Sequence, residues 1–227
     1  MTSLAFDTTA LSHFARADRM DELQMAVADD DPVLLAEVAA ELARGVPGYP
    51  ALGSAAAGGW LKQVELEELP ELAAFARYKG ELGGGPERNN GEAAVLAWVS
   101  VNGGVAIIDE VAARTMGARE RLQVHGSLWL LIRSFKSRVH DRATVEAIVD
   151  DLIGTGMRLP VGSGAALSPG PTEMEFSRSK VNRAPSRLSR DGHEPAAVSP
   201  AAARPRSSTL IPIDPSGPTP NGRSART

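Results

Sequence analysis

Two aspartates occupy equivalent places in the sequence. Asp7 and Asp109 each follow a short apolar run with strand character and precede a segment of helical periodicity. Open parallel sheets bind ligands at the edge where the carboxyl ends of their strands meet, so the two carboxylates are expected to share one crevice. Glu92 at the start of one helix, and Glu37 or Glu41 on another, would bring further carboxylates to this edge.

A cluster of carboxylates repels itself and raises some of its pKa values unless a cation compensates. The cation that best fits oxygen ligands is a hard divalent ion, Mg²⁺ or Mn²⁺, which keeps coordination positions open for phosphate. Such an ion lowers the pKa of bound water and neutralises the charge that develops on a reacting phosphate. These acids therefore predict metal-assisted hydrolysis of a phosphodiester.

Composition excludes several other classes of protein. The 227 residues include no cysteine, which excludes thiolate zinc sites, iron–sulfur clusters and thiol nucleophiles. The four histidines show no spacing typical of a metal site or a catalytic triad. No stretch approaches the roughly 20 apolar residues of a membrane span, and Met1 is not followed by a basic and then apolar leader. We therefore expect no membrane association and a cytoplasmic location.

Helices that cover a sheet are needed to position these acids. Short β-rich runs alternate with longer amphipathic ones, which is typical of α/β proteins. The expected strands are 3–6, 33–35, 63–66, 105–108 and 122–124. The expected helical regions are 8–25, 38–45, 69–82, 91–102, 112–116, 128–132 and 145–152. Thr8 or Thr9 is expected to cap the first helix, and Asn89 or Asn90 the helix that carries Glu92. The predicted fold class is α/β, with three layers and a central, mainly parallel sheet.

The charge distribution divides the chain. Residues 1–160 hold 23 acids and 15 bases, whereas residues 161–227 hold 5 acids and 9 bases. The second segment is rich in Pro, Ser and Arg and shows no sustained helical or strand period. Such a segment buries too little apolar surface to offset its backbone entropy. We expect one folded domain at 1–160 and a disordered tail at 161–227.

Four segments carry a family resemblance. In order along the chain they are LAFDTTALSHFARADRMDELQ, VAAELARG, NNGEAAVLAW and AIIDEVAARTMGARERLQVHGSLWLL. This ordered set, over residues 3–160, resembles a PIN domain of the type found in VapC-like toxins of bacterial toxin–antitoxin pairs. The resemblance implies a Rossmann-like α/β/α nuclease fold whose acids bind Mg²⁺ or Mn²⁺ and cleave RNA. Position by position, the catalytic and metal-binding acids would be Asp7, Glu41, Glu92 and Asp109.

The resemblance also implies partners: an RNA substrate, a cognate antitoxin protein and, with the aliphatic helices, a homodimer. Because RNA is a polyanion, its binding requires positive charge. Two basic stretches could supply it: Arg114, Arg119 and Arg121, and then Arg133, Lys136, Arg138 and Arg142.

Several alternatives stay open from the sequence. Glu37 lies four residues before Glu41, on the same helical face, and Glu110 lies beside Asp109, so either neighbour could be the working acid. Each acid also has a structural interpretation, since carboxylates are favoured at helix starts. A PIN-like module that acts through protein partners, without efficient cleavage, is the alternative function. A DNA nuclease is a third, because metal and carboxylates do not distinguish the sugar.

Overall fold

The computed structural model describes residues 1–57 and 59–167, which all belong to one structural unit. Its centre is a five-stranded, all-parallel sheet with the order β3-β2-β1-β4-β5. The strands are β1 (Ser3–Phe6), β2 (Asp31–Leu35), β3 (Lys62–Val64), β4 (Val105–Ile107) and β5 (Gln123–His125). The predicted α/β class with a parallel sheet is confirmed.

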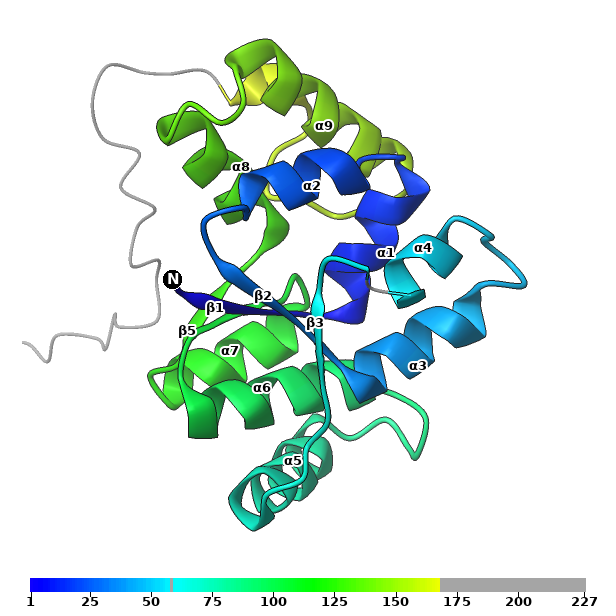
Figure 1. Ribbon diagram of the computed structural model, residues 1–227, viewed down its shortest axis with the longest axis vertical. Helices are drawn as coiled ribbons and strands as arrows, with labels where there is room; N and C mark the ends of the chain where they lie inside the picture. Colours follow the sequence, from blue (N-terminus) through cyan, green and yellow to red (C-terminus); the bar gives the residue numbers. More distant parts are fainter. Residues whose placement is uncertain (58, 168–227) are drawn as a thin grey trace, which may run out of the picture. The chain divides into compact units, whose positions relative to one another are not determined.

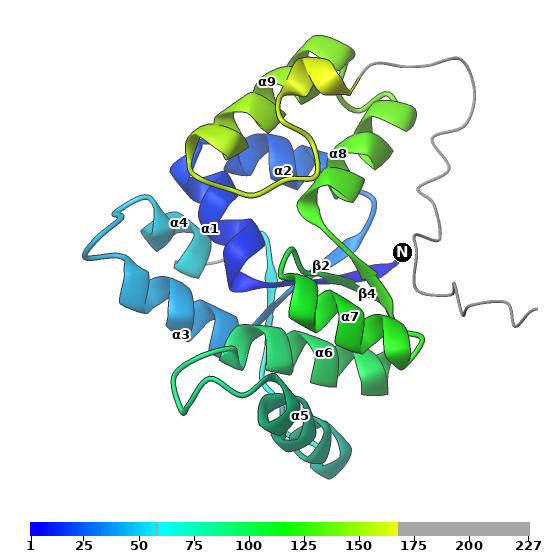
Figure 2. The same cartoon turned by 180° about the vertical axis from the view of Figure 1, so that it is seen from behind.

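Helices cover both faces of the sheet (Figures 1 and 2). The helices are α1 (Thr8–Arg16), α2 (Met20–Ala26), α3 (Ala36–Gly45), α4 (Leu52–Ala57), α5 (Leu69–Leu82), α6 (Asn90–Asn102), α7 (Val111–Arg119), α8 (Ser127–Lys136) and α9 (Arg142–Gly154). Helices α5, α6 and α7 lie on one face and α1, α2, α8 and α9 on the other, while α3 contacts both α1 and α6. The central strands are consequently apolar where they are covered: Leu4 to Phe6 in β1 and Ala106 and Ile107 in β4 are fully buried.

The order of the strands defines where the chain reverses across the sheet. From β1 the chain moves outward to β2 and β3, and then returns to β4 on the other side of β1. Such a switch point leaves a crevice at the carboxyl ends of the two central strands. β1 ends at Phe6, directly before Asp7, and β4 ends at Ile107, two residues before Asp109. The fold therefore places both aspartates at this crevice.

Two stretches differ from the sequence-based expectation. The helical region predicted over 8–25 is broken between α1 and α2, where Asp18 adopts a left-handed backbone with φ of 56°. Aspartate tolerates this conformation better than most residues, and the apolar periodicity runs on across the break. The short helix α4 was not expected; it follows a turn rich in Pro and Gly and buries Leu52 and Ala55.

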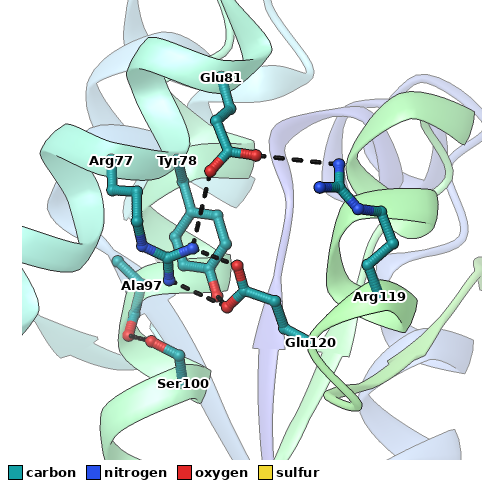
Figure 3. Close-up of polar contacts among 7 residues, drawn as sticks. All are labelled: Arg77, Tyr78, Glu81, Ala97, Ser100, Arg119 and Glu120. Carbon is teal, nitrogen blue, oxygen red and sulfur yellow. Dashed lines mark hydrogen bonds and ion pairs between the residues drawn. The ribbon is translucent and has the colours of Figure 1, made fainter. Parts of the chain in front are cut away.

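A polar network holds α5 against the end of α7 (Figure 3). Tyr78 is fully buried and donates its hydroxyl to Glu120, which also pairs with Arg77. The Arg77 guanidinium lies over the Tyr78 ring, 4.2 Å from its centroid. Because α5 packs on α6, this network steadies the helix that carries Glu92.

The fold continues past residue 160. Residues Gly164–Ala166 form a 3-10 turn that packs on α9, and Gly164 donates its N–H to the Asp150 carboxylate at 2.7 Å. The rest of the segment predicted to be disordered, 168–227, lies outside the described residues. No helix within 1–57 and 59–167 is long and apolar enough to cross a membrane.

Candidate functional site

Asp7 lies at the junction of β1 and α1 and is completely buried. Its carboxylate caps α1, accepting the N–H of Thr8 at 2.6 Å and of Thr9 at 3.3 Å. The prediction that Thr8 or Thr9 would be the cap is wrong, because the helix already begins at Thr8. The backbone N–H of Asp7 donates to Ile107 of β4 at 3.0 Å, which ties the carboxylate to the centre of the sheet.

Glu41 is brought to Asp7 by two donors from other elements. The Thr8 hydroxyl donates to Glu41 Oε2, and the N–H of Gly91 donates to Oε1 at 3.0 Å. Gly91 is needed for this approach: a Cβ there would lie 2.7 Å from Thr8 Oγ1, 2.8 Å from Glu41 Oε2 and 3.3 Å from Asp7 Oδ1. Residues from α1, α3 and α6 therefore converge around one glycine.

Glu92 follows Gly91 in the first turn of α6 and is half-buried. Burial raises the pKa of Asp7 well above its ordinary value, and repulsion by Glu92 and Glu41 raises it further. Burial likewise raises the pKa of Glu92, with additional repulsion by Glu41 and Glu110. The structure thus brings three of the four predicted acids, Asp7, Glu41 and Glu92, within electrostatic reach of one another.

Asp109 is held at the next strand end along the same edge. Its carboxylate accepts the Ser127 N–H at 3.0 Å and the Ser127 hydroxyl at 2.6 Å, at the start of α8. Gly126 permits this contact, since a Cβ there would lie 2.5 Å from Asp109 Oδ1. Burial raises the pKa of Asp109, whereas Ser127 and Arg114 lower it. The Asp109 pKa is thus determined by burial, by the Ser127 hydrogen bonds and by Arg114.

The neighbouring acids left open by the sequence have distinct places. Glu110 is exposed and lines an open pocket of about 300 Å³. The other lining residues are Leu82, Arg88, Asn89, Glu92 and Ala112. Glu92 therefore connects the buried acids with this pocket. Glu37 lies in the first turn of α3, where its Oε2 is buried without a hydrogen-bond partner among the described residues.

The residue that precedes α6 was predicted, but its side-chain hydrogen bonds were not. Asn89 flanks α6 as its cap residue, in a left-handed conformation with φ of 59°, but its side chain makes no capping bond there. Instead its amide donates to Gly83 at 3.2 Å and to Leu82 at 3.4 Å, at the end of α5. The Asn89 side chain thus caps the carboxyl end of α5, and its backbone leads into α6, which carries Glu92.

The chemistry of this donor set fits a hard divalent cation. No ion pair among the described residues involves Asp7, Glu41, Glu92 or Asp109. Arg114 and Lys79 act on Asp109 and Glu92 only from beyond ion-pair distance, and buried carboxylates without a paired cation are the situation that Mg²⁺ or Mn²⁺ relieves. Within 1–57 and 59–167, no three His, Cys, Asp or Glu side chains lie close enough together to coordinate one metal ion in their present conformations.

Some residues of the site were beyond sequence reasoning. The role of Gly91 as a contact point was not predicted, although its position directly before Glu92 is a visible signal. The place of His125 was also not predicted: it ends β5 and stacks on Trp129. Two other histidines pair with hydroxyl groups: His13 with Thr155 at 2.6 Å and His140 with Ser134 at 3.1 Å.

Comparison with known proteins assigns the family. A family model described as PIN domain matches residues 3–163, which includes every acid discussed above. No curated protein and no solved structure matches the chain. PIN domains are nuclease-like and typically depend on divalent metals. Because the match covers well over half of the sequence, the chain belongs to the PIN domain family.

Proposed function

We propose that this protein is a Mg²⁺- or Mn²⁺-dependent endoribonuclease in which Asp7, Glu41, Glu92 and Asp109 hold the metal. The observation that carries the proposal is the fully buried Asp7, next to two further carboxylates and without an ion pair among the described residues, in a PIN domain. Buried carboxylates without a paired cation destabilise a fold, and such groups are concentrated at functional sites.

The metal would supply an activated water and neutralise charge on the phosphate. The chain's own part is to orient the carboxylates. The first turn of α1 fixes Asp7, Thr8 and Gly91 fix Glu41, and Ser127 fixes Asp109. Oxygens fixed in advance lose little entropy when they engage a cation. Glu92, which borders the open pocket, faces the side from which a substrate can approach.

The proposal extends to the partners that the resemblance implies. As a VapC-like toxin in the cytoplasm, the protein would be neutralised by a cognate antitoxin and would form a homodimer. Exposed apolar side chains offer surface for such contacts: Leu69 is 78% exposed and Val111 71% exposed. Single exposed apolar side chains are common on protein surfaces, so these two are compatible with an interface but do not locate it.

A second function is a PIN-like module that binds protein partners and cleaves weakly. One observation favours it: the described residues hold no finished three-ligand metal cage. A DNA nuclease is the third candidate, because the acids carry no information on the sugar.

A cleavage assay separates these functions. The full chain is incubated with single-stranded RNA and with DNA of the same sequence, in Mg²⁺, in Mn²⁺ and in chelator. We expect metal-dependent cutting of RNA alone. Cutting of DNA supports the third candidate, and no cutting of either strand by the folded protein supports the second.

Matched variants then identify the working acids. Glu41→Gln is compared with Glu37→Gln on the same helix, and Asp109→Asn with the adjacent Glu110→Gln. We expect Glu41→Gln and Asp109→Asn to abolish cleavage and their neighbours to retain it, because only Glu41 and Asp109 are held toward the strand ends by hydrogen bonds. The reverse pattern would transfer the roles to Glu37 and Glu110.

A further inference from the structure

An aromatic stack stands at the end of β5. The rings of His125 and Trp129 are nearly parallel, at 6°, with centroids 4.2 Å apart. The Arg133 guanidinium lies 5.0 Å from the centroid of the Trp129 ring and also pairs with Asp30. Trp129 is thus fixed by α8 and by Arg133, and it holds the His125 imidazole in a defined plane. Both rings remain partly exposed to solvent.

The stack lies along the same sheet edge as the acids. His125 pairs with Ile107 in the register of β4 and β5, and its carbonyl accepts the N–H of Ile108 at 2.8 Å. Two residues after His125, Ser127 holds the Asp109 carboxylate. Since β1 lies on the other side of β4, the edge presents Asp7, Asp109 and His125 on three successive strands.

Arg114 adds a positive charge at this place. It lies on α7, is exposed, and takes part in no ion pair among the described residues. Its backbone N–H donates to the carbonyl of Glu110, the residue after Asp109, at 3.0 Å, and α7 packs against β5, which ends at His125. The charge of Arg114 also lowers the pKa of His125. A cation left free beside carboxylates is suited to an anionic ligand, and arginine is well matched to phosphate.

We propose that His125, supported by Trp129, and Arg114 form a nucleotide subsite for a single-stranded nucleic acid. An unpaired base stacks on the free face of the imidazole, and Arg114 holds a phosphate of the same strand. Bases stack on aromatic rings whatever their sequence, because each has a π-face. The subsite rests on the proposed function: it would set the strand beside Asp109, so that the adjacent phosphodiester meets the acids.

The test is binding without cleavage. A labelled single-stranded oligoribonucleotide is titrated with the full chain in chelator, and its dissociation constant is read from fluorescence anisotropy. We expect His125→Ala to weaken binding by about tenfold, within the range for loss of one base stack. His125→Phe, which keeps a flat ring, should stay within about twofold of the unmodified protein.

The role of Arg114 is tested by the salt dependence of binding. Arg114→Gln should weaken binding several-fold and reduce the slope of log affinity against log salt by about one, the signature of one lost phosphate contact. Arg44→Gln is the control, since Arg44 is an exposed arginine outside both basic stretches, on α3, and lies toward Glu87. The C-terminal bases are present in every variant, so their contribution cancels in the comparison.

Other oligonucleotides show which part of the nucleic acid the subsite binds. DNA of the same sequence should depend on His125 as RNA does, because both present a base and a phosphate. A strand of abasic sites should bind equally to the unmodified protein and to His125→Ala. If His125→Phe binds as weakly as His125→Ala, the ring does not act by stacking and the subsite is wrong.

Failure of the subsite and failure of the nuclease proposal can be told apart. If the unmodified protein cuts RNA but His125→Ala and Arg114→Gln bind as it does, the nuclease stands and the subsite falls. If nothing is cut but binding depends on both residues, the subsite stands alone. Should His125→Ala unfold, His125→Gln gives the comparison without a ring. Loss of a protein partner with nucleic-acid binding unchanged would assign the surface to that partner instead.

Discussion

The Asp7 carboxylate accepts two hydrogen bonds from α1 and lies beside Glu41 and Glu92. The hydrogen bonds favour its charged form, but burial and the neighbouring carboxylates outweigh them and raise its pKa. In the metal-free protein this charge therefore lowers stability, whereas a bound cation would make it favourable. Removing the charge should separate folding from activity.

Asp7→Asn is expected to stabilise the metal-free protein and to remove its activity. An amide oxygen can still cap α1, so the helix is retained. We expect the melting temperature in chelator to rise by a few degrees, the shift that about 1 kcal/mol gives in a domain of this size. Cleavage in Mg²⁺ should fall by about 100-fold or more, as when a transition-state contact is lost.

The control is Asp21→Asn, which neutralises an exposed acid in the first turn of α2. It should change neither the melting temperature nor cleavage appreciably. A fall in the melting temperature of Asp7→Asn would show that its capping bonds outweigh the buried charge.

Three raised pKa values, those of Asp7, Glu92 and Asp109, make stability depend on pH. The folded protein holds these protons more tightly than the unfolded chain. The contribution of these three groups to the free energy of unfolding in chelator should therefore fall as the pH rises from about 4, where free carboxyl groups titrate, through the raised pKa values. Glu71, Glu120 and Asp141, whose pKa values are lowered, contribute in the opposite direction. Saturating Mg²⁺ should reduce the fall, because it favours the ionised carboxylates.

Urea unfolding between pH 4 and pH 8, with and without Mg²⁺, measures this dependence. Asp7→Asn should show a shallower fall in chelator than the unmodified protein. Equal slopes with and without Mg²⁺ would mean that the cation does not bind these acids.

At the scale of elements, α6 brings Gly91 against the acids while it carries Glu92. Gly91→Ala would place a methyl group 2.7 Å from Thr8 Oγ1 and 2.8 Å from Glu41 Oε2, closer than such atoms pack. Glu41 must then move away from Asp7. We expect Mg²⁺ affinity, measured by calorimetry, to fall by about tenfold or more, as when a group that orients metal ligands is disturbed.

Gly80→Ala is the matched control in α5, since a Cβ there meets nothing within 4 Å. It should leave Mg²⁺ affinity unchanged and stabilise the helix by up to about 1 kcal/mol, the difference in helix propensity. Unchanged Mg²⁺ affinity in Gly91→Ala would show that the site tolerates the displaced Glu41.

Elements with a clear period were predictable from sequence, and those that depend on distant contacts were not. β1 and α5 were predicted with their observed limits, because the apolar run of β1 ends at Asp7 and the helical period of α5 is closed by Gly83. The break at Asp18 and the helix α4 were not predicted. The break depends on one backbone angle, and α4 depends on the burial of Leu52 and on contacts with α1 and α3.

At the scale of the whole molecule, the topology explains why the strand ends that carry the two aspartates could be predicted, whereas the side-chain contacts of the acids could not. The apolar runs before Asp7 and Asp109 predict two adjacent strand ends, and the sheet order places them so. The Thr8–Glu41 and Asp109–Ser127 hydrogen bonds join residues 33 and 18 positions apart. Such pairs depend on how helices from different parts of the chain pack on the sheet, which no local pattern encodes.

The limit of the folded domain gives the last prediction. Val161 and Leu167 pack against the core, and the Gly164 N–H donates to Asp150 in α9, so residues 161–167 complete the fold. A chain ending at residue 167 should melt at the temperature of the full chain. A chain ending at 160 should melt several degrees lower, since it loses two partly buried apolar side chains worth about 1 to 3 kcal/mol together. Equal melting of the two shorter chains would place the boundary at 160, and a less stable 1–167 chain would mean that later residues contribute to the core.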